Sequence, residues 1–261
     1  MKKGNGYSFK LQIEDVKRLY FIDKQSCGEI AKRFGVTKAA VRLLLSRNGI
    51  KLRTKSDSQE LNSNFITLDK KIKEFINGLL LGDGSLVMAR HQKSARYSHS
   101  DKNKEYIHWL KKELENFGFK VETSTEIRGS RKYYHLNTKS YRDLIEVRRI
   151  WYPLGEKKTP DIRISPIVLF NWYVGDGHYN PPFKIGGLSG EQITIAMLYD
   201  KIGRKNLVEK LNKLGICCTE HQTCIYIKAK SRKDFFRYIG RHRLTVPVCY
   251  KYKFPERYYA A

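Results

Sequence analysis

Hydrophobic positions near the N-terminus repeat with the spacing of a helix. Over about 12–23, apolar side chains at positions 13, 16, 19 and 20 fall on one helical face. A second short helix over 29–34 ends at Gly35, and Thr37 can cap a third helix over about 38–48. Helix, glycine turn and capped helix together predict a small all-α helix-turn-helix domain over residues 1–50.

The third helix of this domain carries an exposed basic side. The expected core positions are Ile30, Ala31, Val36, Val41 and Leu45, and the exposed basic residues are Lys38, Arg42 and Arg47. A recognition helix makes its groove contacts from such a side. The pattern Ser26-x-x-Glu29-Ile30-Ala31-Lys32-x-x-Gly35-Val36-Thr37 resembles resolvase-like and homeodomain-like DNA-binding modules. The alternative is a packing module with a solvated basic face.

Residues 51–64 have no hydrophobic periodicity and are interpreted as an extended basic linker. Arg53 and Lys55 are expected to lie in the DNA minor groove, as basic arms beside recognition helices often do. Residues 1–60 carry 14 Lys and Arg against 6 Asp and Glu, a net charge of 14 − 6 = +8. This segment is therefore predicted to bind DNA weakly by itself.

The rest of the chain contains one pattern twice, which predicts two half-domains, 65–160 and 161–261. Each copy opens with an apolar helix ending in Gly-Asp-Gly, at 75–84 and at 168–177. The second of these helices has Ser165 as its N-cap and Pro166 in its first turn.

Further elements recur in the same order in both copies. The pairs are Asp101-Lys102 and Asp200-Lys201, helices ending at Gly118 and Gly215, strand-like stretches at 121–126 and 132–137 or 216–220 and 224–228, Lys-Ser-x-x-Asp at 139–143 and 230–234, and a lysine before a proline at 157–160 and 252–255. Each half is therefore predicted as αββαββα, and the fold class as α+β with pseudo-twofold symmetry.

The paired Gly-Asp-Gly sequences point to chemistry. One such sequence usually marks a turn or a helix end, but an aspartate at a helix C-terminus faces the negative end of the helix dipole and is disfavoured there. If the two helices pack together, the two carboxylates converge and call for divalent cations. Gly78, Gly82 and Gly175 would allow close packing of the helices, whereas Asn171 stands where the first copy has Gly78.

Charge identifies the expected partner. The formal charge is 51 − 26 = +25, and basic residues are interleaved with tyrosines along the whole chain, which favours nucleic acid over a membrane surface. No apolar run has membrane-spanning length and no signal sequence is recognised, so a cytosolic, nuclear or organellar location is expected. The five cysteines fit no paired zinc spacing and are expected to be reduced.

With these motifs, residues 65–258 resemble the single-chain, two-motif LAGLIDADG homing endonucleases. The resemblance implies that the motif helices form the interface between the halves and that the strands form a saddle along double-stranded DNA. It implies Mg²⁺ at Asp83 and Asp176, with the carbonyls of Gly82 and Gly175 as further ligands. It also implies a monomer that cuts one strand at each centre and leaves short 3′ overhangs, with no small-molecule substrate.

The resemblance further implies catalytic lysines at Lys158 and Lys253, whose ammonium groups would stabilise the developing phosphorane. Asp101 lies where family members often have a polar residue, usually Gln, that orients water. The DNA-binding candidates are Arg90, Lys93, Arg96, Tyr97, Arg128, Arg131, Lys132 and His135 in the first half, and Lys184, His221, Tyr226 and Lys228 in the second. The alternative for these residues is a solvated sheet face.

Two other functions fit the same scaffold. An intron RNA maturase or a non-cleaving DNA-binding regulator would be favoured by loss of a motif acid or lysine. Both acids and both lysines are present, so the sequence favours cleavage.

Overall fold

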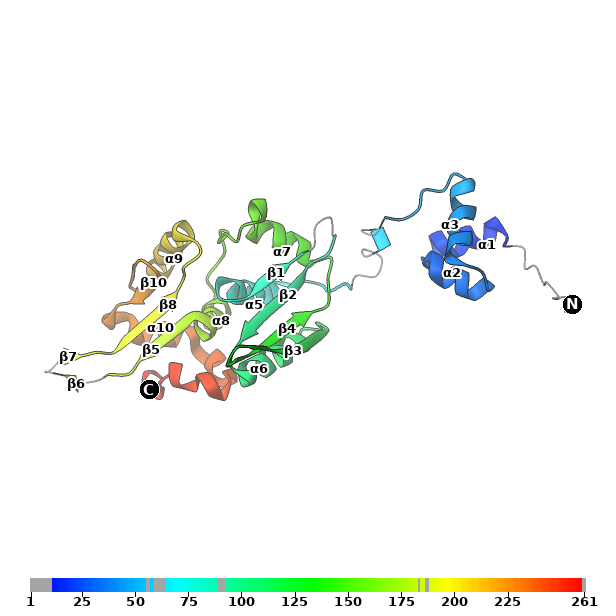
Figure 1. Ribbon diagram of the computed structural model, residues 1–261. Helices are drawn as coiled ribbons and strands as arrows, with labels where there is room; N and C mark the ends of the chain where they lie inside the picture. The colour runs from blue at the N-terminus through cyan, green and yellow to red at the C-terminus, as the bar shows by residue number, and fades with distance from the viewer. Residues whose placement is uncertain are drawn as a thin grey trace, which may run out of the picture. The chain divides into compact units, whose positions relative to one another are not determined.

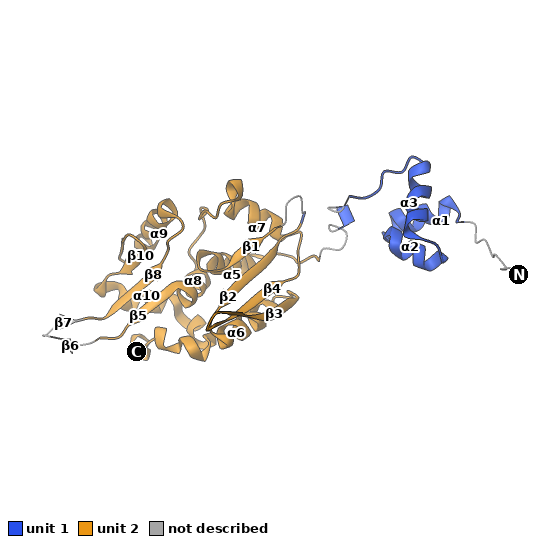
Figure 2. Ribbon diagram, viewed as in Figure 1, with its two compact units in different colours: residues 1–63, 91–93 blue, residues 64–90, 94–261 orange. Residues whose placement is uncertain are grey.

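The computed structural model describes residues 11–54, 57–58, 64–88, 93–182, 184–185 and 188–259, with 184–185 and 188–189 described by their backbone alone. The chain forms two compact units, residues 1–63 with 91–93 and residues 64–90 with 94–261 (Figure 2).

The first unit is a small helical domain. Its elements are α1 (Ile13–Lys17), the π-helical turn η1 (Arg18–Ile22), α2 (Cys27–Phe34) and α3 (Lys38–Arg47). Gly35 ends α2 at φ 64°, a left-handed conformation that suits glycine, and the Thr37 side chain caps α3. The expected core is confirmed except at Val36, which is only partly buried. Val16, Leu19 and Tyr20 complete this core.

The second unit contains the two predicted αββαββα halves, so the α+β fold class is confirmed. The first half consists of α5 (Lys70–Leu81), β1 (Ser85–Val87), β2 (Arg96–Asp101), α6 (Lys104–Asn116), β3 (Val121–Arg128), β4 (Arg131–Thr138) and α7 (Leu144–Trp151). The second half consists of α8 (Pro166–Asp176), β5 (Gly177–Asn180), β8 (Gln192–Ala196), α9 (Lys201–Lys213), β9 (Cys218–Glu220), β10 (Cys224–Ile227) and α10 (Arg232–Ile239). A small hairpin of β6 (Lys184–Ile185) and β7 (Leu188–Ser189) lies between β5 and β8.

The two main sheets have equivalent antiparallel topologies. Their strand orders are β1-β2-β4-β3 and β5-β8-β10-β9. In each sheet one face packs on helices and contributes to the core, for example through Leu136 and Ile225, while the other face is left uncovered (Figure 1). The helices α5 and α8 lie between the two sheets (Figure 1).

The close packing of α5 against α8 depends on Gly78. A Cβ atom at this position would lie 2.7 Å from the Val168 carbonyl oxygen and 2.8 Å from Asn171 Cβ. The residue at the equivalent position of the other motif therefore fills the space that glycine leaves. The expectation of close packing fails at Gly175, where a Cβ would meet no atom within 4 Å. At Gly82 it would make only an ordinary contact, 3.5 Å from Asp176 Oδ1.

Ser165 occupies the N-cap position of α8 as predicted, but its hydroxyl donates to Glu74 Oε2 at 3.0 Å and caps no backbone amide. This bond joins the start of α8 to α5. The short 3₁₀-helical stretches after α10 were not predicted. They are η4 (Gly240–Thr245), η5 (Val248–Lys253) and η6 (Glu256–Tyr258), and η4 and η6 pack on α10.

Candidate functional site

The aspartates of the two motifs converge on one hollow. Asp83 follows the C-terminus of α5, and Asp176 is the last residue of α8. Both line a hollow of about 660 Å³ together with Asp101, Gly175 and Lys253. Burial and, after it, the negative charge of Asp83 together raise the pKa of Asp176 to about 7. A carboxylate pair of this kind is stabilised by protons or by cations.

A lysine from each half donates to the motif backbone; Lys253 is buried and Lys157 is half-buried. Lys157 Nζ lies 2.7 Å from the Gly82 carbonyl oxygen and 2.9 Å from that of Gly84. Lys253 Nζ lies 2.7 Å from the carbonyl oxygen of Val174 and 3.3 Å from that of Gly175. Burial lowers the pKa of both lysines to about 8, although the motif aspartates oppose this shift. The two glycine carbonyls considered as metal ligands therefore accept lysine hydrogen bonds.

The first lysine differs from the prediction. Lys158 is exposed and its Nζ lies 3.7 Å from Glu156 Oε2, so the sequence assignment is corrected by one residue to Lys157. The sequence favoured Lys158 because it precedes Pro160 by two residues, as Lys253 precedes Pro255. After α7, however, the Lys158 amide donates to the Trp151 carbonyl at 2.8 Å, and it is the preceding residue whose side chain reaches the motif.

Asp101 lies in the hollow with part of its carboxylate surface exposed. Its Oδ1 accepts the Asn103 amide at 2.6 Å, and its Oδ2 accepts the Tyr250 hydroxyl at 3.0 Å. The Tyr250 ring lies 4.2 Å below Lys253 Nζ, and the Tyr199 ring lies 4.5 Å from Lys157 Nζ. Sequence reasoning missed both tyrosines, whose only signal was their place beside repeated motifs: Tyr199 directly before Asp200, and Tyr250 three residues before Lys253.

The repeat equivalent of Asp101 has different surroundings. Asp200 is only 6% exposed; its Oδ2 accepts the Thr159 amide at 2.7 Å and its Oδ1 accepts the Gly203 amide at 2.9 Å. Asp200 therefore joins the closing segment of the first half to the start of α9 and does not line the hollow.

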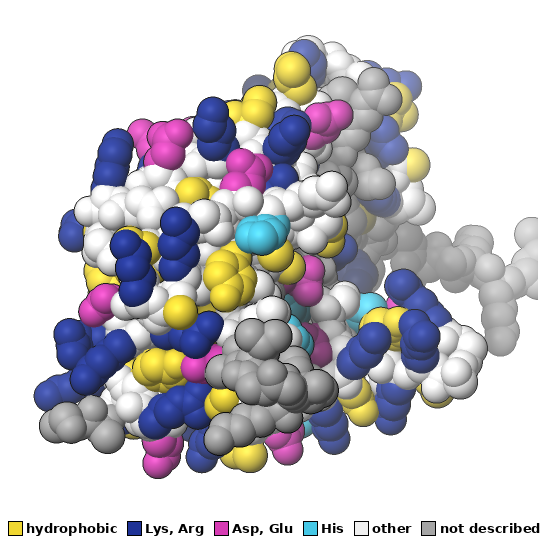
Figure 3. All heavy atoms as spheres, turned by 90° about the vertical axis from the view of Figure 1, so that its left-hand side faces the viewer, with side chains coloured by type: hydrophobic (Ala, Val, Ile, Leu, Met, Phe, Trp, Pro, Cys, Tyr) yellow, Lys and Arg dark blue, Asp and Glu magenta, His cyan; other side chains and the backbone are white. Residues whose placement is uncertain are grey.

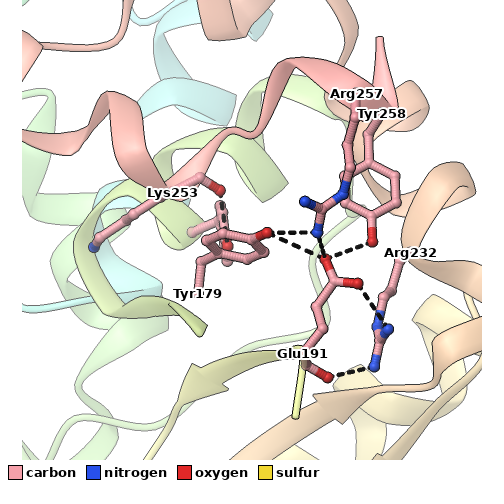
Figure 4. A network of polar contacts seen from close by, with 7 residues as sticks. Tyr179, Glu191, Arg232, Lys253, Arg257 and Tyr258 are labelled. Carbon is pink, nitrogen blue, oxygen red and sulfur yellow. Dashed lines mark hydrogen bonds and ion pairs between the residues drawn. The ribbon is translucent and has the colours of Figure 1, made fainter. Parts of the chain in front are cut away.

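The segment that carries Lys253 is held by a polar network around the buried Glu191 (Figure 4). The partners of Glu191 are Arg232 Nη1 at 2.9 Å, the Tyr258 hydroxyl at 2.6 Å, the Tyr179 hydroxyl at 3.2 Å, and Arg257. The Lys253 carbonyl oxygen in turn accepts the Tyr173 hydroxyl at 3.1 Å. These contacts fix the chain at Lys253 and in the residues that follow it.

The uncovered face of the first sheet carries several of the predicted DNA-binding residues. The register places Arg128 opposite Arg131 and Arg96 opposite Val87. His135, opposite Ser124, lies on the same face and contacts Glu126 at 2.9 Å. Lys132 belongs to the other face by its register, and its Nζ lies 5.5 Å from the Tyr134 ring centroid.

Tyr97 is a wrong prediction for a DNA contact. It is fully buried, and its hydroxyl lies 3.1 Å from His99 Nδ1 within the core of the first half. Strand alternation explains the error, because its neighbours Arg96 and Ser98 point to the uncovered face while Tyr97 points to the helices.

The second sheet presents fewer charges on its uncovered face. Tyr226 lies there opposite Thr194, with the exposed His221 ring 5.7 Å from its own, and Lys228 is exposed just after β10. Lys and Arg side chains are spread over the outer surface of this half, with Asp and Glu side chains among them (Figure 3). Arg90 and Lys55 lie outside the described residues, as does the side chain of Lys184.

In the helical unit, Lys38, Arg42 and Arg47 are exposed on α3 as predicted. Arg53 does not belong to a free arm: its Nη2 donates to the carbonyls of Tyr20 at 2.9 Å and Gln25 at 2.5 Å, and its guanidinium lies 3.9 Å from the Tyr20 ring centroid. The guanidinium N–H groups that would donate to a DNA phosphate therefore donate to backbone carbonyls of the same unit. Lys93 Nζ lies 3.5 Å from Asp57 Oδ1.

Within the described ranges, no cluster of three or more His, Cys, Asp or Glu side chains is arranged to hold a metal ion. The carboxylates that line the hollow are those of Asp83, Asp176 and Asp101, and the two motif aspartates with nearby backbone oxygens are the candidate metal ligands. Such a set fits Mg²⁺, which binds few protein carboxylates and keeps water or phosphate ligands. Among the described helices, none is long and apolar enough to cross a membrane.

Comparison with known proteins agrees with this geometry. The structure of the homing endonuclease I-WcaI bound to its DNA recognition sequence is similar in fold, with a TM-score of 0.59 and 17% identity over 80% of this chain and 96% of that one. The uncharacterized protein MJ1098 of Methanocaldococcus jannaschii is 29% identical over 168 residues, covering 60% of this chain and 63% of that protein. The cytochrome b mRNA maturase bI2 of Debaryomyces hansenii is 30% identical over 122 residues, covering 42% and 47%.

The match therefore spans less than two thirds of the length of these two relatives. The family model for the LAGLIDADG DNA endonuclease family matches residues 73–242, which include both Gly-Asp-Gly helices and Lys157. Since this match covers more than half of the sequence and both motifs lie within it, the chain belongs to the LAGLIDADG DNA endonuclease family.

Proposed function

We propose that this protein is a sequence-specific endonuclease that hydrolyses both strands of double-stranded DNA with a divalent cation, Mg²⁺, held by Asp83 and Asp176. The observation that carries the proposal is the convergence of these two carboxylates in one hollow, with a lysine from each half bonded to the backbone of each motif. A carboxyl group with a raised pKa beside two lysines with lowered pKa values is typical of a catalytic site.

The raised pKa of Asp176, about 7, supports cation binding. Burial and the charge of Asp83 disfavour the ionised carboxylate, and a bound cation would stabilise this charged form in place of the proton. When bound, the cation supplies Lewis-acid stabilisation of the phosphate and activates water. The scissile phosphate and water would complete its coordination.

The lysines supply fixed positive charge. Lys157 and Lys253 are each held by two backbone carbonyls, so their ammonium groups are oriented before DNA binds. Negative charge develops on the phosphate oxygens during hydrolysis, and oriented donors in a buried site stabilise it. Asp101, whose carboxylate is fixed by Tyr250 and Asn103, is positioned to accept a proton from the attacking water.

DNA would lie along the uncovered faces of the two sheets. We assign phosphate and base contacts to Arg96, Arg128, Arg131 and His135 in the first half and to Tyr226, His221 and Lys228 in the second. Because one chain carries both halves, 65–160 and 161–261, a monomer suffices for a double-strand cut with short 3′ overhangs. The module 1–50, joined through the linker 51–64, would add contacts from Lys38, Arg42 and Arg47.

An RNA maturase is the second candidate, favoured by the similarity to the Debaryomyces hansenii protein that bears this name. Retention of both motif acids and of a lysine bonded to each motif favours DNA cleavage as the primary activity.

The test is selection of cleavable sites from a randomised duplex library in Mg²⁺, with the wild type beside Asp83→Asn and Asp176→Asn at one stated salt concentration. Specific double-strand cuts by the wild type, reduced to nicks or abolished in each variant, are expected. Binding without any cut by the wild type would refute the proposal and favour the maturase or regulator.

A further inference from the structure

The surroundings of Lys157 and Lys253 differ, although the two lysines hold similar places in the repeat, and of the two only Lys253 lines the hollow. At both, an aromatic ring lies beneath the ammonium group, with Tyr250 below Lys253 and Tyr199 below Lys157. The two tyrosines come from different places in the second half, since Tyr250 belongs to η5 and Tyr199 directly precedes Asp200 and α9. Their hydroxyl groups consequently reach different partners.

Tyr250 links the two halves at the Lys253 centre. Its hydroxyl donates to Asp101 Oδ2 at 3.0 Å and accepts Asn103 Nδ2 at 3.1 Å, so one residue of the second half fixes a carboxylate of the first. The residue is 8% exposed, and burial raises the pKa of its hydroxyl, which therefore keeps the proton that it donates. An ionised carboxylate has about four acceptor sites, so Asp101 retains acceptor capacity towards the hollow.

The Lys157 centre lacks this arrangement. The Tyr199 hydroxyl lies 3.4 Å and 3.5 Å from the carbonyl oxygens of Leu80 and Leu81, and it reaches no carboxylate. Asp200, the equivalent of Asp101, uses both oxygens on buried backbone amides. Among the residues that the structure describes, the Lys253 centre alone therefore has a carboxylate that is both fixed and open to the hollow.

We propose that Tyr250 is a positioning residue that fixes Asp101 and Lys253 at one cleavage centre, and that the two DNA strands are cut at unequal rates because the Lys157 centre has no such carboxylate. This inference rests on the proposed endonuclease function. Tyr250 acts through its hydroxyl on Asp101 and through its ring on Lys253, and need not touch DNA.

The experiment uses the full chain and a duplex with a selected target site, labelled differently on its two strands, under single-turnover conditions in Mg²⁺. Tyr250→Phe keeps the ring below Lys253 and removes the hydroxyl. We expect the faster strand to slow by about tenfold or more, within the range of lost acid–base assistance, and the other strand to keep its rate. Tyr252→Phe is the matched control, because this exposed tyrosine lines the same hollow and makes no hydrogen bond to Asp101.

Metal-free measurements separate positioning from folding. Tyr250→Phe should retain the thermal midpoint of the wild type within a few degrees and its DNA affinity in EDTA. Asp101→Asn should slow the same strand, and the double variant should be no slower than the slower single variant, as expected when two residues act as one unit. If Tyr250→Phe does not fold, the strand preference of Asp101→Asn decides the question.

Equal slowing of both strands by Tyr250→Phe, or slowing of neither, would overturn the assignment. A wild type that cuts both strands at one rate would overturn the inequality while leaving the endonuclease function intact. A wild type that binds the site and cuts neither strand would refute the proposed function itself.

Discussion

Lys157 and Lys253 make equivalent contacts in the two halves, since the Nζ atom of each lies within 3.3 Å of the carbonyl oxygen of the glycine that precedes a motif aspartate, Gly82 or Gly175. Lys253 is buried and Lys157 half-buried, and loss of solvent lowers the pKa of each to about 8. A buried ammonium group beside two carboxylates contributes more to charge stabilisation than an exposed one, because solvent screens it less. The lysines therefore differ sharply from the many exposed cations of this chain.

Lys157→Met and Lys253→Met should each lower the cleavage rate constant by about 10²-fold or more, since each removes a positive charge that is oriented towards the developing phosphate charge. The measurement is single-turnover cleavage at saturating protein. Lys158→Met is the control, because Lys158 is exposed and pairs only with Glu156. If Lys158→Met were the damaging change and Lys157→Met were harmless, the assignment from the structure would be wrong.

The stability of the metal-free protein should depend on pH through Asp176. Its pKa of about 7 lies above the ordinary value of 3.8, because burial and Asp83 disfavour the charged form. The folded protein therefore holds the Asp176 proton more tightly than the unfolded chain does. This preference stabilises the fold fully below pH 3.8, and the stabilisation is lost as pH rises through about 7. The lysines, whose pKa is lowered from 10.5 to about 8, act in a separate window: their contribution is present above 10.5 and lost as pH falls through about 8.

Chemical denaturation of the metal-free protein between pH 5 and pH 7 should contain this loss of stability with rising pH, together with an opposite contribution from His99, whose pKa burial lowers from 6.5 to about 4. Asp176→Asn should remove the Asp176 part of the slope and leave the His99 part. Saturating Mg²⁺ should also reduce the Asp176 part, because the cation favours the charged carboxylate. An unchanged slope in Asp176→Asn would show that other groups govern this range.

The repeat in the sequence was sufficient to predict the halves and their order of elements. The apolar helices ending in Gly-Asp-Gly and the recurring strands each match an observed element, because hydrophobic period and turn residues determine local structure. The contact of Gly78 with Asn171 was also predictable, since the two residues occupy the same position of the motif and pseudo-twofold packing brings such positions together.

The wrong or missing assignments have two causes: adjacent residues of the same type, and contacts between residues that are distant in the sequence. Lys157 and Lys158 have the same chemistry, and the path of the chain after α7 decides which side chain reaches the backbone of the first motif. Arg53 resembled a free basic residue because its carbonyl partners, at Tyr20, Lys24 and Gln25, are distant in sequence. Tyr250 bonds to a residue 149 positions away, and no local pattern predicts such a contact.

Asp200→Asn should destabilise the metal-free protein by about 1–3 kcal/mol, because the asparagine amide would face a buried backbone donor and leave it unsatisfied. Asp200 accepts from both Thr159 and Gly203 at 6% exposure. Urea denaturation measures the change, and Asp101→Asn, at the half-buried equivalent position, is the control with a smaller expected loss. Equal destabilisation by the two variants would contradict the structural role assigned to Asp200.

Gly78→Ala should cost about 1–3 kcal/mol of unfolding free energy, the usual range for overpacking, because its methyl group would lie 2.7 Å from the Val168 backbone oxygen. Gly175→Ala is the matched change in the other motif helix, where a methyl group meets no atom within 4 Å. This variant should be as stable as the wild type. The paired denaturation curves show whether the helix contact depends on glycine at one position only.

Arg42 and Arg53 of the helical unit have different surroundings, so replacing the first should affect DNA binding and replacing the second should affect stability. Arg42 is exposed on α3, so Arg42→Ala should weaken DNA binding and lower the slope of log affinity against log salt by about one, with no change in stability. Arg53→Ala should instead destabilise the unit, because three carbonyls lose their donor and Tyr20 loses the stacked guanidinium. Salt-dependent binding and thermal unfolding of the full chain measure both effects. If Arg42→Ala and deletion of residues 1–60 both left the salt slope unchanged, the helical unit would not contact DNA, and its exposed basic side would be only a solvated surface.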